Sequence, residues 1–422
     1  MSVKMGGIGS SFEKNIEISK PENVIHPRTV SLHLLVKNGE SCLKRLFENV
    51  HPFIDEIVAI VNDTTDNTIP LLTDLCKEIQ LPLKVIEVNF LTNPEFYIID
   101  TAVSYKYGNP IDNEEFGGPF TEKPLLADWA GIRNLGFKQC TKDYILFLDA
   151  DDVVDDPASI PSLCEQMYQG EVEMLCSRYI FSSLDGMSFA DSYRERLIKN
   201  VDHIYWNGVT HEVLMGAKKK VYLEGSLIVR DFKDSLGKDI RIPGRCLKVL
   251  YNHCRKYNWN VSPRDLIYLG MECKRPLPRL AKAVLNKYLD KSLWPEERAW
   301  ACSMVGEIYE KELKYSDASK WYERSLREHP GSKSAFRLCR SKFNEGKWSD
   351  SIAAYELGKA NSCVVQLLDN GPAYDDLSKI LIAVAYEKLG KFPESLAICD
   401  DALKIFPTNQ RLLVLRNHLS RL

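Results

Sequence analysis

The sequence predicts an α/β domain with a mostly parallel sheet, followed by an all-α domain of helical repeats. Three apolar runs in the first half, at 30–36, 57–61 and 144–148, show little polar alternation, which is typical of strands buried on both faces. Segments with a helical period separate these runs, and alternating strands and helices indicate a layered α/β fold. After Asp234 the helical pattern continues to the end and contains an internal repeat.

The first domain has further elements. Helices are expected at 40–49, 66–79 and 125–139, and another strand at 83–88. From 171 to 229 short strand patterns and loops are mixed, so we expect antiparallel strands to join the sheet there. The stretch 90–123 contains Gly and Pro without a sustained period. A loop of this length is usually a lid, a binding loop or a disordered insert, and the sequence leaves these open.

The repeats begin at three aromatic residues, Tyr315, Trp348 and Phe392, each followed by a polar turn and by small and apolar residues. The first two lie 33 residues apart, close to the tetratricopeptide period of about 34. The third lies 44 residues further on, which predicts an insert around 361–375. The alternative is a generic helical bundle. We therefore expect an N-terminal extension at 1–28, an α/β domain at 29–235 with an insertion at 90–124, and tetratricopeptide-like helices at 236–422.

Composition excludes several classes of protein. The 422 residues are 45% hydrophobic and 27% charged, which is ordinary globular usage. A net charge of −3 gives no general attraction to nucleic acid or anionic membranes. The 12 cysteines form no C-x-x-C pair, so they indicate neither a zinc site nor a redox dithiol. Without a signal peptide or a long apolar run, we expect a soluble cytoplasmic protein that does not bind membranes.

Polar residues follow each predicted strand of the parallel sheet. Lys37 and Asn38 follow the first, Asn62 and Asp63 end the second, and the acidic segment 149–152 follows the third. Ligands of open α/β sheets bind beyond the carboxyl ends of the strands. These side chains are therefore expected at one edge of the sheet.

The acidic segment Asp149-Ala150-Asp151-Asp152 carries the most specific chemistry. In an extended chain Asp149 and Asp151 would point the same way, and their carboxylates would repel each other unless a cation lay between them. Mg²⁺ or Mn²⁺ bridging to phosphate oxygens suits such a pair. Acidic loops after strands are also common without a metal, so a D-x-D tripeptide alone is weak evidence.

An ordered set of motifs carries a resemblance to a known family. The set is Lys37-Asn38-Gly39-Glu40, Asp128-Trp-Ala-Gly-Ile-Arg133-Asn134, Asp149-Ala-Asp151-Asp152, Arg196 and Gly208-Val-Thr-His211-Glu212. With it, the chain resembles family 2 glycosyltransferases of the Rossmann-like GT-A fold, joined to tetratricopeptide repeats. Its architecture is similar to that of the bacterial peptide S-glycosyltransferase type.

The resemblance implies a nucleotide-diphosphate sugar as donor and Mn²⁺ or Mg²⁺ as cofactor. It implies metal ligands at Asp151 and His211, and a catalytic base at either Glu212 or Asp152. The implied donor-binding residues are Lys37, Asn38, Asn62, Asp63, Asp128, Arg133, Asp149 and Arg196. Structural alternatives stay open for two of these residues: Arg133 as an ion-pair partner of Asp128 or Asp149, and His211 as a packing residue.

Two positions depart from the family pattern. Val61 stands where relatives commonly carry the Asp that holds the nucleotide base, and Asn62 or Asp63 would have to serve instead. Arg230-Asp231 stands where many relatives have a His. This departure implies either that one metal ligand is missing or that the charge of Arg230 replaces the cation.

The resulting hypothesis is an inverting glycosyltransferase that acts on a hydroxyl or thiol of a macromolecular acceptor, preferably a peptide or protein. The repeats would bind the acceptor or form a homodimer, because repeat arrays present extended surfaces. One alternative is glycosylation of a hydroxymethylated DNA base, for which the basic residues would be Lys218-Lys219-Lys220 and those within 241–279. The other alternative is a non-catalytic scaffold with a degenerate transferase fold.

Overall fold

The computed structural model describes residues 28–99, 123–182, 188–231, 244–361 and 371–421. They fall into two compact units. The first holds the described residues from 28 to 231, and the second holds those from 244 to 421. The expected extension at 1–28 and the insert near 361–375 lie largely outside the described residues, as does 100–122 of the expected insertion.

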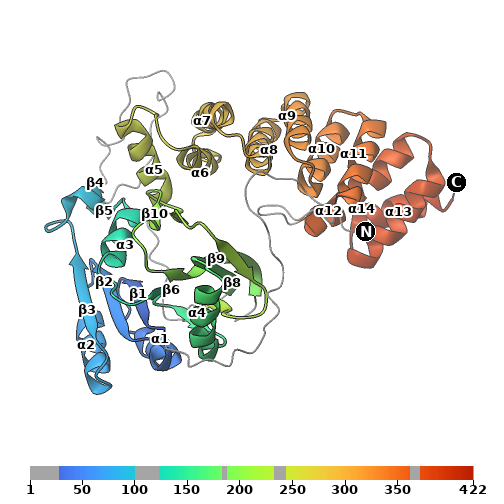
Figure 1. Ribbon diagram of the computed structural model, residues 1–422. Coiled ribbons are helices and arrows are strands. Elements are labelled where there is room, and N and C mark those ends of the chain that lie inside the picture. The colour runs from blue at the N-terminus through green and yellow to red at the C-terminus, as the bar shows by residue number, and fades with distance from the viewer. Residues whose placement is uncertain (1–27, 100–122, 183–187, 232–243, 362–370, 422) are drawn as a thin grey trace. The chain divides into compact units, whose positions relative to one another are not determined.

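A mixed sheet forms the centre of the first unit, in the strand order β3-β2-β1-β6-β9-β8-β13-β7 with β12 beside β8. The strands β1, β2, β3 and β6 are parallel (Figure 1). Their bounds are Val30–Val36, Glu56–Asn62, Leu83–Val88 and Tyr144–Asp149. These four strands confirm the mostly parallel sheet that the apolar runs predict.

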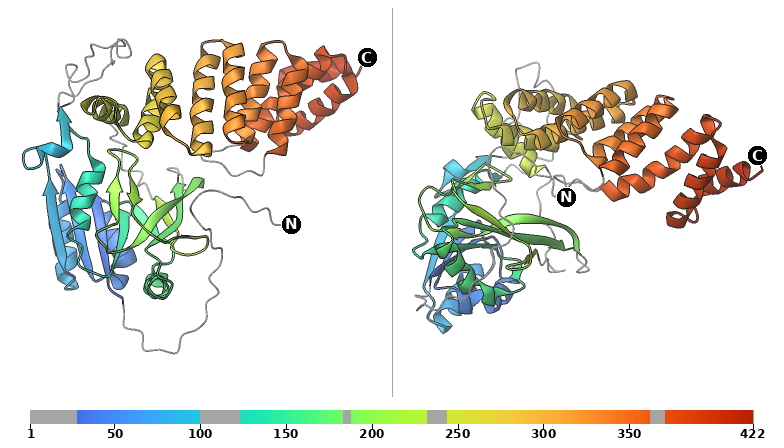
Figure 2. Two further views of the ribbon diagram at one scale, coloured as in Figure 1. Left: turned by 45° about the horizontal axis from the view of Figure 1, so that its top comes forward. Right: turned by 45° about the vertical axis from the view of Figure 1, so that its right-hand side comes forward.

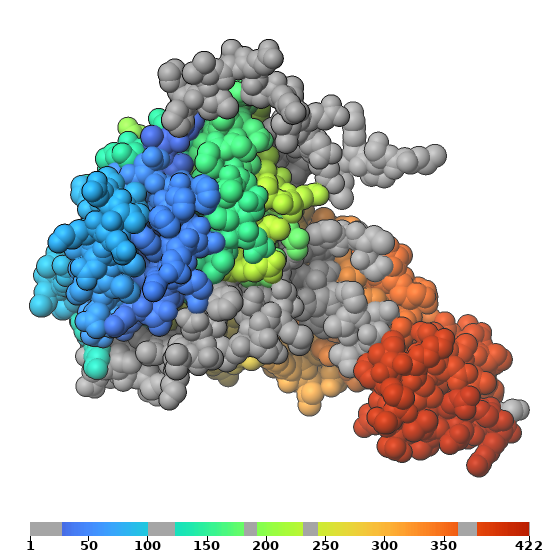
Figure 3. Space-filling view, turned by 90° about the horizontal axis from the view of Figure 1, so that it is seen from below, coloured from blue at the N-terminus to red at the C-terminus, as the bar shows by residue number. Residues whose placement is uncertain are grey.

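Antiparallel strands extend the sheet beyond β6, as the mixed pattern at 171–229 predicts. β9 pairs antiparallel with both β6 and β8, and β7 pairs antiparallel with β13. The bounds are Asp152–Val154 for β7, Met174–Ser182 for β8, Ser188–Lys199 for β9, Lys220–Leu223 for β12 and Val229–Asp231 for β13. In the space-filling view, blue and green surfaces of this unit lie side by side, so segments that are far apart in the sequence are neighbours in space (Figure 3).

Different layers cover the two faces of the sheet. On one face Leu34 of β1 packs in a core with Leu46, Leu72 and Leu163, which belong to the helices α1 (Leu43–Val50), α2 (Thr68–Glu78) and α4 (Ile160–Gln169). On the other face lie α3 (Trp129–Phe137) and the antiparallel pair β10 (Tyr205–Asn207) and β11 (Val213–Met215). Alternate residues of the buried strands therefore serve two separate cores.

The segment before α3 differs from the sequence-based prediction in two ways. A 3₁₀ turn at Pro94–Phe96 leads into β4 (Tyr97–Ile99), which pairs antiparallel with β5 (Pro124–Leu126), although no element was expected within 90–123. The helix expected from residue 125 begins only at Trp129. Asp128 ends the extended segment and caps the helix, since its carboxylate accepts the N–H of Gly131 at 2.8 Å. Side chains of this type favour the N-cap over the helix interior. Further 3₁₀ turns lie at His51–Phe53 and Pro157–Ser159.

The second unit is an array of helices in which successive helices pack against each other (Figure 2). The bounds are Arg245–Lys256 (α5), Pro263–Cys273 (α6), Pro278–Lys291 (α7), Pro295–Lys311 (α8), Tyr315–Glu328 (α9), Ser332–Asn344 (α10), Trp348–Ala360 (α11), Gly371–Lys388 (α12), Phe392–Ile405 (α13) and Gln410–Leu419 (α14). The three predicted repeat starts each begin a helix, α9, α11 and α13. Within the described residues no helix is both long and apolar enough to cross a bilayer.

Candidate active site

The first two parallel strands end in loops that are hydrogen-bonded to each other. Lys37 and Asn38 follow β1 and are exposed. Asn38 has a left-handed φ of 51°, a conformation that Asn tolerates better than most residues. Its Oδ1 accepts the N–H of Thr65 at 2.8 Å, and its own N–H donates to Thr64 Oγ1 at 3.1 Å. Asn38 therefore fixes the first loop against the second.

Asn62 and Asp63 end β2 at the same edge. Asn62 is buried, while Asp63 has φ 46° and lies partly exposed. The Tyr97 hydroxyl of β4 donates to Asp63 Oδ2 at 2.9 Å. Burial, together with the Asp63 carboxylate, raises the pKa of Tyr97 well above its usual value. Asp63 is thereby held by a residue that lies 34 positions further along the chain.

The acidic segment after β6 is a turn and not an extended chain. The strand ends at Asp149, and Ala150 and Asp151 form the turn before β7. The extended geometry expected for Asp149 and Asp151 is therefore wrong, because the carboxylate of Asp152 folds back to the strand end. Its Oδ2 accepts the backbone N–H of Asp149 at 2.9 Å.

Asp152 lies beneath this turn and is 0% exposed. Its Oδ1 accepts a hydrogen bond from the Tyr179 hydroxyl at 3.0 Å, and Arg196 Nη2 lies 3.4 Å from its Oδ2. Burial raises the pKa of Asp152 to about 7, opposed by Arg196 and reinforced by the carboxylates of Asp149 and Asp151. The turn therefore concentrates negative charge, which a bound cation would neutralise.

Arg196 and Arg230 are both engaged by partners. Arg196 is 2% exposed, and its Nη1 donates to the carbonyl of Phe147 at 3.1 Å. It therefore supports β6 from within the core. Arg230 of β13 forms a bidentate pair with Asp155, with three N–O distances of 2.7–2.9 Å. Its guanidinium charge is directed to Asp155, and no contact joins it to Asp149.

Arg133 joins the acidic turn to a second carboxylate. From α3, its Nε donates to Glu212 Oε1 at 2.7 Å, and its Nη2 lies 3.5 Å from Asp149 Oδ1. The guanidinium carbon lies 4.4 Å from the centre of the Phe147 ring and 5.1 Å from that of Trp206. Although burial opposes the charged form, Glu212 and Asp149 raise the pKa of Arg133. Of the two expected ion-pair partners, the structure shows Asp149; Asp128 caps the helix instead.

His211 and Glu212 lie on the loop that joins β10 to β11. The loop begins at Gly208, whose φ of 102° favours glycine, and His211 has φ 52°. The N–H of Trp129, the first residue of α3, donates to the carbonyl of Val209 at 3.2 Å. This bond fastens the loop to α3. It lets the Glu212 carboxylate accept the hydrogen bond from Arg133, which lies 79 residues earlier in the sequence.

Sequence reasoning missed several residues that shape this edge. Tyr97 and Tyr179 bind predicted site carboxylates, and Trp206 and Phe147 flank Arg133. Asn134, whose side-chain amide is hydrogen-bonded to the backbone of Trp206, is the one missed residue with a sequence signal, because it follows Arg133 in one of the motifs. Aromatic residues of this kind are ordinary core residues in a sequence, and their role depends on contacts across distant segments.

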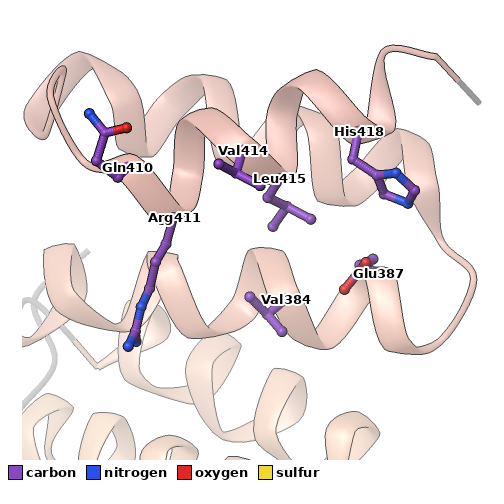
Figure 4. Close-up of a pocket in the computed structure, with 7 residues that line it drawn as sticks. All are labelled: Val384, Glu387, Gln410, Arg411, Val414, Leu415 and His418. Carbon is purple, nitrogen blue, oxygen red and sulfur yellow. The ribbon is translucent and has the colours of Figure 1, made fainter.

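A hollow of about 500 Å³ lies in the second unit. In Figure 4, Val414 and Leu415 of α14 face Val384 of α12 across it, and His418 lies opposite Glu387. Three aliphatic side chains line it together with Gln410, Arg411, His418 and a single carboxylate, that of Glu387. This chemistry differs from that of the acidic edge of the sheet, and we assign no ligand to the hollow.

Comparisons with solved structures return matches of low similarity. S. aureus TarS 1–349 in complex with UDP-GlcNAc is 12% identical over 81% of this chain and 95% of that one, with a TM-score of 0.35. Pseudomonas aeruginosa PilF is 15% identical over 41% and 72%, with a TM-score of 0.33, and MamA is 18% identical over 37% and 79%, with a TM-score of 0.31. We draw no conclusion from alignments with TM-scores this low. A search of curated protein sequences finds no match.

The family comparison is informative about the first unit. Residues 127–220 match the model described as glycosyl transferase family 2. This segment begins before the cap of α3 and contains Arg133, the acidic turn and the loop with Glu212. The resemblance inferred from the sequence is therefore confirmed over residues 127–220.

Proposed function

We propose that the protein is an inverting glycosyltransferase that moves a sugar from a nucleotide-diphosphate donor to a hydroxyl or thiol of a macromolecular acceptor. The observation that carries the proposal is the bridge by Arg133 between Asp149 and Glu212, inside the family-matched segment. The bridge brings a carboxylate at the end of a parallel strand, where α/β folds bind ligands, close to a second carboxylate on another element. A single displacement needs one such base on the acceptor side.

The donor would lie along the edge formed by the ends of β1, β2 and β6. Asp149 keeps 37% of its side chain exposed and is our candidate for contact with the ribose or sugar. Lys37 is exposed beside it in the strand order and suits phosphate contact. Asn38, Asn62, Asp63, Asp128, Arg133 and Arg196 would shape this donor edge, chiefly by holding the loops and helix that line it.

A divalent cation would suit the acidic turn. Its donor set is carboxylate oxygen, which Mg²⁺ and Mn²⁺ prefer. Burial, reinforced by the carboxylates of Asp149 and Asp151, raises the pKa of Asp152, and a cation would offset the charge of these groups. Asp151, with His211, would hold the ion. When bound, such an ion stabilises the negative charge of a departing diphosphate.

Glu212 is our candidate for the catalytic base, in preference to Asp152. Arg133 binds its Oε1, and within the described residues Oε2 has no hydrogen-bond partner. The side chain is 15% exposed, whereas that of Asp152 is 0% exposed. A base must come within hydrogen-bond reach of the proton that it takes. Asp152 would instead hold the turn that carries Asp149 and Asp151.

The acceptor is proposed to be a peptide or protein, with the helical repeats as its binding surface or as a dimer contact. The support is the architecture alone, a glycosyltransferase segment followed by a helical array. Arrays of this kind bind extended partners along their surfaces.

A donor-binding experiment tests the proposal. The melting temperature is measured with pooled uridine and guanosine diphosphate sugars, with and without Mn²⁺, because a ligand that binds only the folded state raises it. We expect an increase that Asp151→Ala abolishes and Asp156→Ala retains, since Asp156 is an exposed carboxylate outside the turn. Mass spectrometry of candidate acceptors after incubation with the same pool should show the mass gain of one sugar. The absence of any melting shift and of any mass gain would support the non-catalytic scaffold instead.

A further inference from the structure

The side-chain amide of Asn134, on α3, is hydrogen-bonded to the backbone of Trp206 on β10. Its Nδ2 donates to the carbonyl of Trp206 at 2.8 Å, and its Oδ1 accepts the N–H of the same residue at 2.7 Å. One amide side chain thus satisfies both backbone groups of a single residue on β10. Such a bidentate contact fixes position and orientation together.

The pairing of β10 with β11 explains why this contact exists. Tyr205 pairs with Met215, Trp206 with Leu214, and Asn207 with Val213. In an antiparallel pair, alternate residues direct their N–H and C=O groups away from the partner strand. The backbone groups of Trp206 point outward in this way, and the Asn134 amide takes the place of a third strand.

The Trp206 side chain is also fixed in place, by burial and by aromatic contacts. It is 5% exposed, and its ring packs edge-on against Phe147, 4.9 Å between centroids, and against Phe137, 5.8 Å. Because Phe137 belongs to α3 and Phe147 to β6, the strand is locked to both the helix and the sheet. Movement of β10 relative to α3 would break the Asn134 bonds and this packing together.

The short loop after β10 makes the position of Glu212 depend on the position of β10. Only five residues, 208–212, separate Asn207 from Val213, and these two are themselves paired across the hairpin. The loop has a further anchor in the bond from Trp129 N–H to the Val209 carbonyl. At its end, Glu212 meets Arg133, the residue next to Asn134.

We propose that Asn134 is a positioning residue: through the backbone of Trp206 it sets the place of Glu212 relative to Asp149. This inference rests on the proposed function, since it concerns the base of that reaction. Arg133 orients the Glu212 carboxylate, while Asn134 fixes β10, the strand that precedes the loop with Glu212. A displacement of about 1 Å at a reacting group can cost on the order of 100-fold in rate.

The test compares Asn134→Ala with a matched control, Asn200→Ala. Asn200 also donates from Nδ2 to two backbone carbonyls, those of Cys140 and Lys142, at 3.0 and 2.8 Å, but these lie before the start of β6 rather than at its acidic end. The assay is hydrolysis of the pooled nucleotide-diphosphate sugars in the presence of Mn²⁺. The rate is measured from the amount of nucleotide released. We expect Asn134→Ala to lower kcat about 10- to 100-fold with donor KM changed less than about threefold. Asn200→Ala should lower the melting temperature and leave kcat within about twofold.

A double-mutant cycle separates positioning from a general structural effect. If Asn134 acts through Glu212, Asn134→Ala should cost less than about twofold in a Glu212→Gln background. Equal losses in both backgrounds, no loss in either, or an equal loss for Asn200→Ala would overturn the proposal. If Asn134→Ala does not fold, Asn134→Asp, which keeps an acceptor for the Trp206 N–H, enters the same cycle. A wild-type protein that neither binds nor hydrolyses any donor would overturn the proposed function itself, and with it the role of Asn134. If the wild-type protein hydrolyses a donor but Asn134→Ala lowers kcat equally with and without Glu212→Gln, only the positioning role of Asn134 is overturned.

Discussion

Arg196 and Asp152 show how a buried ion pair supports an exposed chemical edge. Both side chains are almost fully buried, yet Asp152 accepts the N–H of Asp149 and Arg196 donates to Phe147 of the same strand. The pair thereby holds the backbone at the end of β6 through hydrogen bonds from the core. Its effect on a reaction would be indirect, through the shape of the acidic turn.

Removing Arg196 should therefore destabilise the protein in a pH-dependent manner. Arg196→Met leaves Asp152 buried without its cation, which typically costs about 3–5 kcal/mol. The loss should be largest at pH 8, because the wild-type pKa of Asp152 is already raised to about 7 and rises further without Arg196. At pH 5 the carboxyl can take up a proton, and the loss should be smaller. Urea unfolding at both pH values measures this difference.

The control for this prediction is Arg230→Met. The Arg230 and Asp155 side chains are 39% and 33% exposed, and ion pairs of this kind contribute about 0–1 kcal/mol. Its loss should be small and similar at both pH values. An Arg196→Met loss that is equally independent of pH would contradict the assignment to Asp152.

His33 supplies a second test at the scale of a residue. It lies on β1, 0% exposed, between Phe137 and Phe147, and burial, with a contribution from Arg133, lowers its pKa from 6.5 to about 3. The unfolded chain therefore binds a proton near pH 6.5 that the folded chain binds only near pH 3. Stability attributable to His33 is present above pH 6.5 and is lost as the pH falls between these values.

His33→Leu should remove this acid sensitivity. At 1.36 kcal/mol per pKa unit, the wild-type penalty at pH 5 is about 2 kcal/mol relative to pH 8. The difference in unfolding free energy between pH 8 and pH 5 should shrink by about that amount in the variant. Chemical denaturation at the two pH values measures it, and an unchanged difference would assign the acid sensitivity to other groups.

At the scale of elements, the sequence predicts what depends on local pattern. The run 83–88 is a strand with those bounds, and Tyr315, Trp348 and Phe392 each begin a helix. Leu125 and Leu126 are an exception, since the pattern predicts a helix from residue 125, whereas Pro124–Leu126 is a strand paired with β4. Three residues carry too little periodicity to separate the two, and a partner 27 residues earlier decided the outcome.

The candidate site could be predicted only in part, for a related reason. The residues that follow β1, β2 and β6 come to one edge because parallel strands end together. The contact of Arg133 with Glu212 spans 79 residues, and the contact of Tyr179 with Asp152 depends on the position of β8 in the sheet. Neither is encoded in a local pattern. The roles assigned to these residues stay predictions.

The helical repeats depend on close approach at glycine. A Cβ at Gly306 of α8 would lie 2.6 Å from the ring of Tyr322 on α9, and one at Gly358 of α11 would lie 2.5 Å from Phe336 on α10. Both rings are buried. In both pairs an aromatic ring on one helix packs directly against the backbone of the adjacent helix.

Gly306→Ala should consequently destabilise the second unit, although alanine is the better helix former by about 1 kcal/mol. The contact is too close for a methyl group, and overpacking of this kind typically costs about 1–3 kcal/mol. We expect a lower melting temperature for the transition that loses helical circular dichroism. A net stabilisation would show that Tyr322 moves aside readily and that close packing at Gly306 is not required.

At the scale of the whole molecule, the two units differ in the origin of their contacts. The first unit is held by pairings between distant strands, such as β1 with β6, whereas each helix of the second packs mainly on its neighbours in sequence. Arrays of the second kind unfold with limited cooperativity across their length. A chain composed of two such units need not unfold as one two-state system.

A donor should therefore stabilise only one of the two units. The acidic turn, Arg133 and Glu212 all belong to the first unit, so nucleotide diphosphate with Mn²⁺ should raise its melting transition alone. At a ligand concentration of 100 Kd the gain is about 2.7 kcal/mol. Scanning calorimetry resolves the transitions, and Gly306→Ala identifies the one that belongs to the repeats. Asp151→Ala should abolish the donor-dependent shift while leaving the repeat transition in place. An equal shift of both transitions would mean that the repeats unfold together with the donor-binding unit or contribute to donor binding, and the assignment of the donor edge to the first unit alone would be wrong.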